Sequence, residues 1–275
     1  MPLELKPVSP AIGIDIAGLD VSKPLDDATF GRVRQAWYEG LILLFRNQAL
    51  DEKQQADFGA RFGELGKVLN KHGGSGSHPG VMYISNIVEN GRLIGALPDG
   101  EMYFHSDQCY VERPAMATML YAMEIPSRGG NTLFANMYRA YETLTDEVKA
   151  KLAGKKAWNV YDYQGNPTRR GMAAADAPRC AHPLFRTHPA TGRKALYANR
   201  LMTVAIEGMA PAESDRLLEL LFDHAERPEF VYQHAWRPGD LILWDNRCTL
   251  HARTDFDASE RRKLRRVALL GEVPV

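Results

Sequence analysis

The chain has few cysteines and no long apolar run. Its three cysteines, Cys109, Cys180 and Cys248, are an odd number, lie far apart and include no CxxC pair. This pattern argues against a disulfide framework and a structural zinc knuckle, and it favours a reducing, cytoplasmic location. No apolar run approaches the roughly 18 residues that span a membrane. The N-terminus also lacks a basic segment followed by an apolar one, so we expect neither a membrane segment nor a signal peptide.

The chain also lacks net charge. It has 34 basic and 34 acidic residues among 275. No overall field therefore favours nucleic acid or a membrane surface as a partner, and any anion must be bound locally. Hydrophobic residues make up 45% of the chain, which is enough for a sizeable core. We predict one domain over residues 1–275, although the length would also permit two.

Most of the predicted elements are short strands. Alternating or continuous apolar segments predict strands at 3–6, 11–20, 41–45, 81–87, 117–125, 131–134, 182–187, 195–198, 230–236, 241–245 and 265–270. Helical spacing predicts helices at 27–39, 51–63, 136–144, 145 to about 154, and 211–225, the last with Leu220 on its buried side.

Two regions are rich in glycine and polar residues. They cover 66–103, around the strand at 81–87, and 159–180, which we expect to be an irregular insert. We expect both regions to provide active-site loops, because binding residues often lie on loops held by a rigid scaffold.

The arrangement of these elements predicts a mainly β fold with helical decoration, either a sandwich or a barrel. A doubly wound α/β fold would need regular alternation of strands and helices. The glycine-rich segment 73–76 also lacks the spacing and the following helix of a nucleotide-binding loop.

Phe104-His105-Ser106-Asp107 is the segment that most strongly suggests chemistry. In an extended backbone, residues two apart point to the same face, so His105 and Asp107 would converge. A second histidine would complete the facial triad of non-haem Fe(II) oxygenases. A His-x-Asp pair alone is more often a surface pair or an oriented core histidine.

Seven other histidines could supply the third ligand: 72, 78, 182, 188, 224, 234 and 251. His251 follows the apolar strand 241–245, at the mouth of the predicted core, and spacing favours it without excluding the others. Arg262 and Arg266 follow it and share a face if 262–270 is a strand. Arginine suits a carboxylate held at two points, although 261–266 could also be a solvated basic edge.

In chain order, these motifs resemble the Fe(II)/2-oxoglutarate-dependent taurine dioxygenase (TauD/TfdA) family, which includes dioxygenases of phenoxyacetate herbicides and alkyl sulfates. The motifs are His105-Ser106-Asp107, Gly129-Gly130-Asn131-Thr132, Trp244-Asp245-Asn246-Arg247 with His251, and Arg262 with Arg266. The resemblance covers almost the whole chain. It implies a double-stranded β-helix (jelly-roll) core flanked by helices.

The resemblance also implies roles for individual residues. His105, Asp107 and His251 match the iron ligands, which are the catalytic residues. Thr132 and Arg262 match the residues that hold the distal carboxylate of 2-oxoglutarate. Arg266 matches an arginine near the metal-side carboxylate of the co-substrate and the anionic head of the substrate. Phe104 stands where the family often has tryptophan, and Gly-Gly-Asn-Thr replaces Gly-Gly-Asp-Thr; we expect this turn to be kept.

The implied cofactors are Fe(II), 2-oxoglutarate as co-substrate and O2. The implied reaction is hydroxylation of a small organic acid, of the sulfonate, sulfate ester or phenoxyalkanoate type, with release of succinate and CO2. Two alternatives stay open: a metal-binding jelly-roll sensor without oxygenase activity, and a metal-dependent hydrolase that activates water.

Substrate contacts are the least specified part of the site. Candidates are Arg266, Phe104, His72 and Met202, although Phe104 and Met202 are also ordinary packing residues. The sequence assigns no role to His72 or His78 and no conformation to a lid at 159–180. A small anionic organic substrate and a homo-oligomer, dimer or tetramer, are the expected partners, with no nucleic acid and no membrane.

Overall fold

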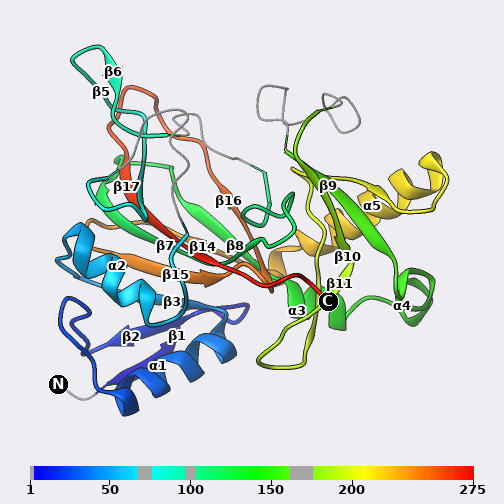
Figure 1. The fold of residues 1–275 in the computed structure, drawn as a ribbon, viewed down its shortest axis with the longest axis horizontal. Coiled ribbons are helices and arrows are strands. Elements are labelled where there is room, and N and C mark those ends of the chain that lie inside the picture. Colours follow the sequence, from blue (N-terminus) through cyan, green and yellow to red (C-terminus); the bar gives the residue numbers. More distant parts are fainter. Residues whose placement is uncertain (1–2, 67–75, 97–102, 162–175) are drawn as a thin grey trace.

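The computed structural model describes residues 3–66, 76–96, 103–161 and 176–275. Its largest element is a seven-stranded sheet with the order β1-β2-β3-β15-β7-β17-β4 (Figure 1). All neighbouring strands in this sheet are antiparallel except β2 and β3. The strands are β1 (Glu4–Pro7), β2 (Ile14–Ala17), β3 (Ile42–Phe45), β4 (Val81–Ser85), β7 (Ala115–Glu124), β15 (Leu241–Asp245) and β17 (Lys263–Leu270).

A smaller antiparallel sheet packs against the inner face of the large one. It consists of β14 (Val231–His234), β8 (Thr132–Asn136) and β16 (Thr249–Arg253), with β8 in the middle. Phe134 of β8 and Trp244 of β15 meet between the sheets, with ring centroids 5.5 Å apart. Both side chains belong to the larger apolar core cluster. The two sheets therefore enclose a common interior.

Helices α1 (Asp27–Gly40) and α2 (Glu52–Ala60) cover the outer face of the large sheet (Figure 1). Asp26 caps α1, and Asp51 forms a capping box with Gln54 at the start of α2. Successive side chains of β15 alternate between the two faces: Leu241 and Leu243 pack towards the helices, whereas Ile242 and Trp244 face the interior. This continuous apolar strand is therefore buried on both sides.

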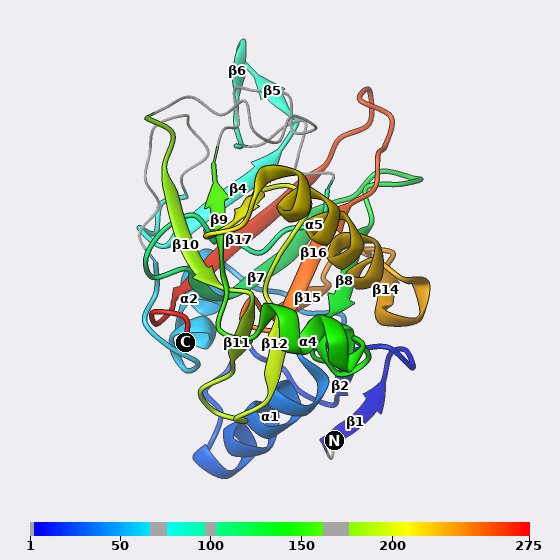
Figure 2. The same cartoon turned by 90° about the vertical axis from the view of Figure 1, so that its right-hand side faces the viewer.

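A second group of elements lies on the right-hand side of Figure 1 and faces the viewer in Figure 2. It contains the sheet β10-β9-β13 and the hairpin β11–β12, together with three α-helices and a short 3-10 helix. The bounds are β9 (Lys156–Val160), β10 (Arg179–Pro183), β11 (Phe185–Thr187), β12 (Lys194–Leu196), β13 (Thr203–Ile206), α3 (Met137–Glu142), α4 (Asp146–Leu152), α5 (Pro211–Ala225) and η1 (Pro228–Phe230).

Two peripheral features complete the described fold. A small hairpin, β5 (Val88–Glu89) with β6 (Arg92–Leu93), projects from one end of the molecule (Figures 1 and 2). The C-terminus lies beside β11, where the Thr187 N–H donates to the Val275 carbonyl over 2.6 Å. None of the helices in the described part of the chain combines the length and apolar character needed to cross a bilayer.

The predicted strands and helices are confirmed, with ends that differ by a few residues, except that the single strand predicted at 182–187 is the end of β10 and all of β11, which belong to different sheets. The prediction of an irregular insert at 159–180 is wrong at both ends, because 159–160 and 179–180 belong to the paired strands β9 and β10. Residues 162–175 lie outside the described residues. The prediction that Leu220 is buried is also wrong. Its side chain is 43% exposed, because the buried stripe of α5 runs through Leu217, Leu218 and Leu221.

Candidate metal centre

His105 and His251 are held together by their backbones. The N–H of each residue donates to the carbonyl of the other, both at 2.9 Å, in an isolated antiparallel bridge. Their rings lie 4.1 Å apart, and Nε2 of His251 lies 3.9 Å from Oδ1 of Asp107. One potential ligand atom from each of these three residues lies within 4.8 Å of the others. The three residues, called the triad below, are all buried.

The two histidines of the triad are suited to bind a metal as neutral imidazoles. Nδ1 of His105 lies 2.9 Å from the Tyr103 carbonyl, which can only accept a hydrogen bond. Nδ1 therefore carries the proton, and Nε2 is the atom with a lone pair for a metal. Burial lowers the pKa of His251 well below its ordinary value, and His105 lowers it further. Neutral imidazole is the form that coordinates metals.

Asp107 is a carboxylate despite its burial. Burial alone would raise its pKa, but Arg266, His251 and His105 together hold the pKa of Asp107 below its ordinary value. Nη2 of Arg266 lies 2.9 Å from Oδ2 of Asp107, whereas Oδ1 lies on the side of His251. The carboxylate thus has one oxygen bound by the protein and one directed towards the imidazoles.

A chain of three hydrogen bonds ends at Oδ2 of Asp107 and orients the carboxylate. The Thr118 hydroxyl donates to Oδ2 of Asp107. The Asn246 amide donates to Thr118 Oγ1 at 3.0 Å, and the Trp244 indole donates to Asn246 Oδ1 at 2.9 Å. Outer-shell partners of this kind fix the direction in which a ligand oxygen points.

The triad fits a divalent iron ion. Two neutral imidazoles and one carboxylate that converge from one side form the donor set of non-haem Fe(II) oxygenases, which keeps further coordination positions open. The burial of all three side chains would keep bulk water away from these positions.

Arg262 provides a buried guanidinium beside the turn that precedes β8. Arg262 precedes β17, is 5% exposed, and donates from Nε and Nη2 to the Gly130 carbonyl at 3.3 and 3.2 Å. Burial lowers the pKa of Arg262 to about 9, with a contribution from Arg253. In the described part of the chain, no carboxylate forms an ion pair with Arg262. A buried cation in such surroundings favours an incoming anion.

Thr132 lies on the same face of the small sheet as His251. It is the first residue of β8 and pairs with Arg253 of β16 and His234 of β14. Phe134, two residues further along β8, pairs with His251. Thr132 follows a turn in which Gly129 and Gly130 have φ of +72° and +62°, which glycine adopts without strain. The turn expected for Gly-Gly-Asn-Thr is therefore formed.

Comparison with known proteins identifies the family. The sequence model of the family described as taurine catabolism dioxygenase TauD, TfdA family matches residues 4–268 of this chain. The chain belongs to this family. It is 35% identical to pentalenolactone F synthase from Streptomyces avermitilis, over 96% of this chain and 92% of that protein. It is 34% identical to (S)-phenoxypropionate/alpha-ketoglutarate-dioxygenase from Sphingobium herbicidovorans, over 94% and 92% of the two chains.

Solved structures agree with this assignment. A taurine dioxygenase from Burkholderia xenovorans has a TM-score of 0.85 and 32% identity, over 99% of this chain and 91% of that one. The AAD-2 structure in complex with Mn(II) and N-oxalylglycine has a TM-score of 0.83 and 30% identity, over 100% and 99%. The chain is thus a mainly β, 2-oxoglutarate-dependent dioxygenase that uses Fe(II) and O2, which confirms the predicted family, enzyme class and cofactors.

The remaining predicted site residues have different surroundings in the structure of the dioxygenase. Phe104 is half-buried against the larger apolar core cluster. Met202 is 3% exposed and packs with Cys109 and Tyr197, so its visible role is packing. His78 fixes a turn, because its Nδ1 accepts from the Gly80 N–H at 3.2 Å. His72 lies outside the described residues.

Trp236 was not among the predicted site residues. Its indole N–H donates to the Thr132 hydroxyl at 3.0 Å, and both residues are buried. A signal was present, because a buried tryptophan needs an acceptor for its N–H. The partner could not be named, since the contact depends on β14 and β8 pairing across about a hundred residues of sequence.

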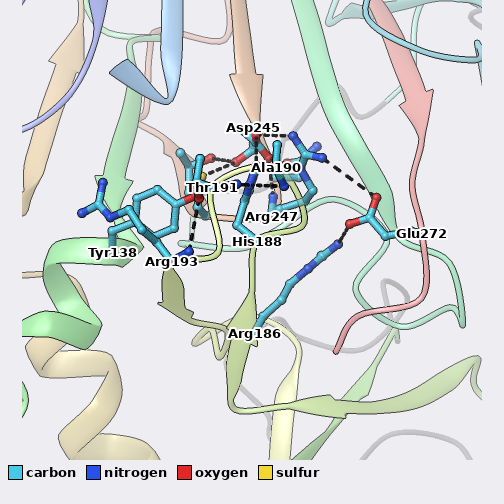
Figure 3. A network of polar contacts seen from close by, with 12 residues as sticks. Tyr138, Arg186, His188, Ala190, Thr191, Arg193, Asp245, Arg247 and Glu272 are labelled. Carbon is cyan, nitrogen blue, oxygen red and sulfur yellow. Dashed lines mark hydrogen bonds and ion pairs between the residues drawn. The ribbon is translucent and has the colours of Figure 1, made fainter. Parts of the chain in front are cut away.

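A second histidine–aspartate group lies elsewhere in the dioxygenase (Figure 3). One potential ligand atom each from His188, Asp245 and Cys248 also lies within 4.8 Å of the others. Arg247 binds both oxygens of Asp245, at 2.8 and 2.7 Å, and His188 lies 3.0 Å from Oδ2. We call these four residues the Asp245 network.

The Asp245 network is closed to a metal ion. The Ala190 and Thr191 N–H groups donate to Nδ1 of His188, so Nε2 carries the proton and donates to Asp245. Burial raises the pKa of the Cys248 thiol far above its ordinary value, so it is not a thiolate ligand. The network instead extends through Arg247 to Glu272 near the C-terminus, which also pairs with Arg186 (Figure 3).

Proposed function

We propose that this dioxygenase hydroxylates a small organic acid of the sulfonate, sulfate ester or phenoxyalkanoate type, with release of succinate and CO2. The observation that carries the proposal is a buried His-Asp-His triad flanked by two arginines, Arg262 and Arg266, which can bind anions. Relatives named for phenoxypropionate and for sulfate ester oxidation support an acidic substrate.

In this proposal, His105, Asp107 and His251 hold the iron. Bound Fe(II) together with 2-oxoglutarate supplies the activation of O2 that C–H hydroxylation requires. Arg262 neutralises the distal carboxylate of 2-oxoglutarate, and the Thr132 hydroxyl donates to it. Burial of the arginine strengthens this attraction, because fewer water molecules screen the two charges.

Arg266 orients the substrate in this proposal. Its guanidinium contacts Asp107 at 2.9 Å, which ties the position of the cation to that of the metal ligand. A guanidinium has five N–H donors in a planar fork, so Arg266 can keep Asp107 and also bind an anionic head group. A substrate held in this way presents the carbon next to its acidic group to the metal. Phe104 is proposed as an apolar wall for the remainder of the substrate.

We extend the proposal to the architecture. The two facing sheets support a double-stranded β-helix core, and the single family match over 4–268 supports one domain over 1–275. The regions 66–103 and 159–180 are proposed as active-site loops. Cys109, Cys180 and Cys248 form no disulfide, which supports a cytoplasmic location. A homo-dimer or homo-tetramer is proposed as the assembly.

A succinate-release screen tests the function. The enzyme is incubated with Fe(II), 2-oxoglutarate, ascorbate and a panel of sulfonates, sulfate esters, phenoxyalkanoates and matched uncharged analogues. We expect at least one acid class to raise succinate release in air and to yield an oxidised product, while the uncharged analogues do not. Product formation under nitrogen, without 2-oxoglutarate, would instead identify a hydrolase.

Arg266→Gln tests the substrate contact separately. We expect the KM for the acid to rise about tenfold or more, because a charge-assisted contact is lost. Arg200→Gln is the control, since Arg200 binds Glu219, Asp223 and Glu226 beside α5. An equal change in KM for both variants would remove Arg266 from the substrate site.

A further inference from the structure

We propose that Trp236 is a positioning residue for the co-substrate: its indole N–H occupies an acceptor site of the Thr132 hydroxyl, so that the hydroxyl's own hydrogen points to the distal carboxylate of 2-oxoglutarate. This inference rests on the proposed roles of Thr132 and Arg262. It adds a residue that acts through Thr132 and touches neither metal nor substrate.

The direction of the hydrogen bond follows from the chemistry of the two groups. Nε1 of Trp236 lies 3.0 Å from Oγ1 of Thr132. An indole N–H can only donate, whereas a hydroxyl has one hydrogen to donate and two acceptor sites. The hydroxyl hydrogen of Thr132 therefore cannot point to Trp236. Within the described residues, no atom accepts a hydrogen bond from this hydroxyl, although Thr132 is only 4% exposed.

The indole is held in place from several sides. The Trp236 ring packs edge-to-face on His234, with centroids 4.7 Å apart. His234 is in turn fixed by Asp240 at 3.0 Å, and Asp240 pairs with Arg46 at 2.8 Å. The turn between β14 and β15 is anchored where the Gly239 N–H donates to the Ala122 carbonyl at 2.9 Å. The donor therefore keeps its direction when a ligand arrives.

The surroundings of the Thr132 hydroxyl select an anion as the missing acceptor. Arg253 pairs with Thr132 across β16 and β8, and it contributes to the lowered pKa of Arg262. Both guanidinium groups lie over the Phe256 ring, at 4.9 and 5.8 Å from its centroid. A hydroxyl donor beside two cations favours a carboxylate over a neutral or a cationic ligand.

The test measures binding without turnover. The Mn(II)-loaded enzyme is titrated by calorimetry with N-oxalylglycine, which has a distal carboxylate, and with oxalate, which has none. The variants are Trp236→Phe, Thr132→Val and the double variant. Trp37→Phe is the matched control, because Trp37 is 1% exposed and no described residue accepts a hydrogen bond from its indole N–H.

We expect Thr132→Val to weaken N-oxalylglycine binding by about tenfold or more, as for a lost hydrogen bond to a charged group. Trp236→Phe should weaken it about three- to tenfold, because the hydroxyl hydrogen can then point elsewhere. The double variant should be no weaker than Thr132→Val alone, since both changes remove one interaction. Oxalate binding should stay within about twofold in every variant, and Trp37→Phe should change neither ligand.

Each contrary outcome has a distinct meaning. If Thr132→Val weakens N-oxalylglycine selectively but Trp236→Phe does not, the role of Trp236 is overturned while the proposed function stands. If Trp236→Phe weakens both ligands equally, Trp236 is only structural. If neither Thr132→Val nor Arg262→Gln distinguishes the two ligands, the proposed co-substrate site itself fails. Should Trp236→Phe not fold, replacing Trp236 with benzothienylalanine keeps the ring volume and removes only the N–H donor.

Discussion

The triad and the Asp245 network contain the same kinds of residue but differ in what their polar atoms already bind. Both are buried, and in both the potential ligand atoms lie within 4.8 Å of one another. In the Asp245 network, Arg247 and His188 bind the carboxylate oxygens. In the triad, Arg266 and Thr118 bind only Oδ2 of Asp107, and Oδ1 lies on the side of the imidazoles.

This difference separates a structural network from a metal centre. Each buried carboxylate has a compensating positive charge from the chain, Arg247 for Asp245 and Arg266 for Asp107, so the two sites differ in which oxygens these contacts occupy. In the Asp245 network, Arg247 binds both oxygens of Asp245 and holds the turn before β16, the strand that contains His251. In the triad, the orientation of the donors leaves room for iron. Neighbouring histidines and aspartates are thus not sufficient evidence for a metal site.

The largest expected effect is on stability, from Asp245→Asn. We expect the free energy of unfolding to fall by about 3–5 kcal/mol, because the buried Arg247 loses its carboxylate. Chemical denaturation of the metal-free protein measures this loss. Glu142→Gln is the control, since it breaks a half-exposed pair with Arg193 and should cost less than about 1 kcal/mol. Similar losses in the two variants would contradict a charge-compensating role for the network.

The next effect is on metal binding, from His251→Gln. We expect the affinity for Fe(II) to fall by more than about 100-fold, since a ligand is lost rather than an outer-shell partner. The stability of the metal-free protein should change by only about 1 kcal/mol, because Nδ1 of His251 makes no hydrogen bond with any described residue. Metal titration and denaturation are measured on the same samples.

His188→Gln is the counterpart of that variant in the Asp245 network. It should reduce stability, because the bond to Asp245 and the two backbone bonds to the ring are altered. It should still bind one Fe(II) ion per chain. Loss of metal binding from His188→Gln without loss of stability would reverse the assignment of the two groups.

Local features of the sequence were enough to predict part of the site. The two-residue spacing of His105 and Asp107 predicts a common face, and the structure brings both next to His251. The four-residue spacing of Arg262 and Arg266 predicts a common face only within one strand, whereas Arg262 precedes β17 and the pairing with β7 shifts register at Lys263. Spacing along the chain favoured His251 but did not exclude the other histidines, because it does not show which strands pair, and the family resemblance was needed to choose among them.

The parts that could not be predicted depend on contacts between distant strands. Thr118 reaches Asn246 because β7 pairs with β15, more than a hundred residues later. Trp236 reaches Thr132 for the same kind of reason. The wrong prediction for Leu220 has a different cause. Adjacent leucines in a helix differ by about 100° in direction, so a leucine-rich composition alone does not show which side of α5 is buried.

A smaller effect is expected from Thr118→Val, which tests the orientation of Asp107. Valine keeps the volume of threonine and removes the hydroxyl that donates to Oδ2, so Fe(II) affinity should fall about 10- to 100-fold. Thr203→Val is the matched control, because Thr203 is equally buried and its hydroxyl binds Asn159. Both variants should lose about 1–2 kcal/mol of stability, but only Thr118→Val should bind metal more weakly. Equal metal affinities would mean that the hydroxyl does not orient the ligand.

The smallest effect is expected from Cys248→Ala, which tests whether the Asp245 network binds a metal at all. Burial keeps the thiol protonated, and Asp245 already has its cation, so a soft ion such as Cd(II) has no thiolate to bind there. Wild type and variant should therefore take up the same number of Cd(II) ions per chain, with affinities within about twofold. Stability should fall by only about 1 kcal/mol, as for a small loss of buried volume. If the variant bound one ion fewer, the Asp245 network would be a second metal site, and the binding of both carboxylate oxygens by the chain would not distinguish it from the triad.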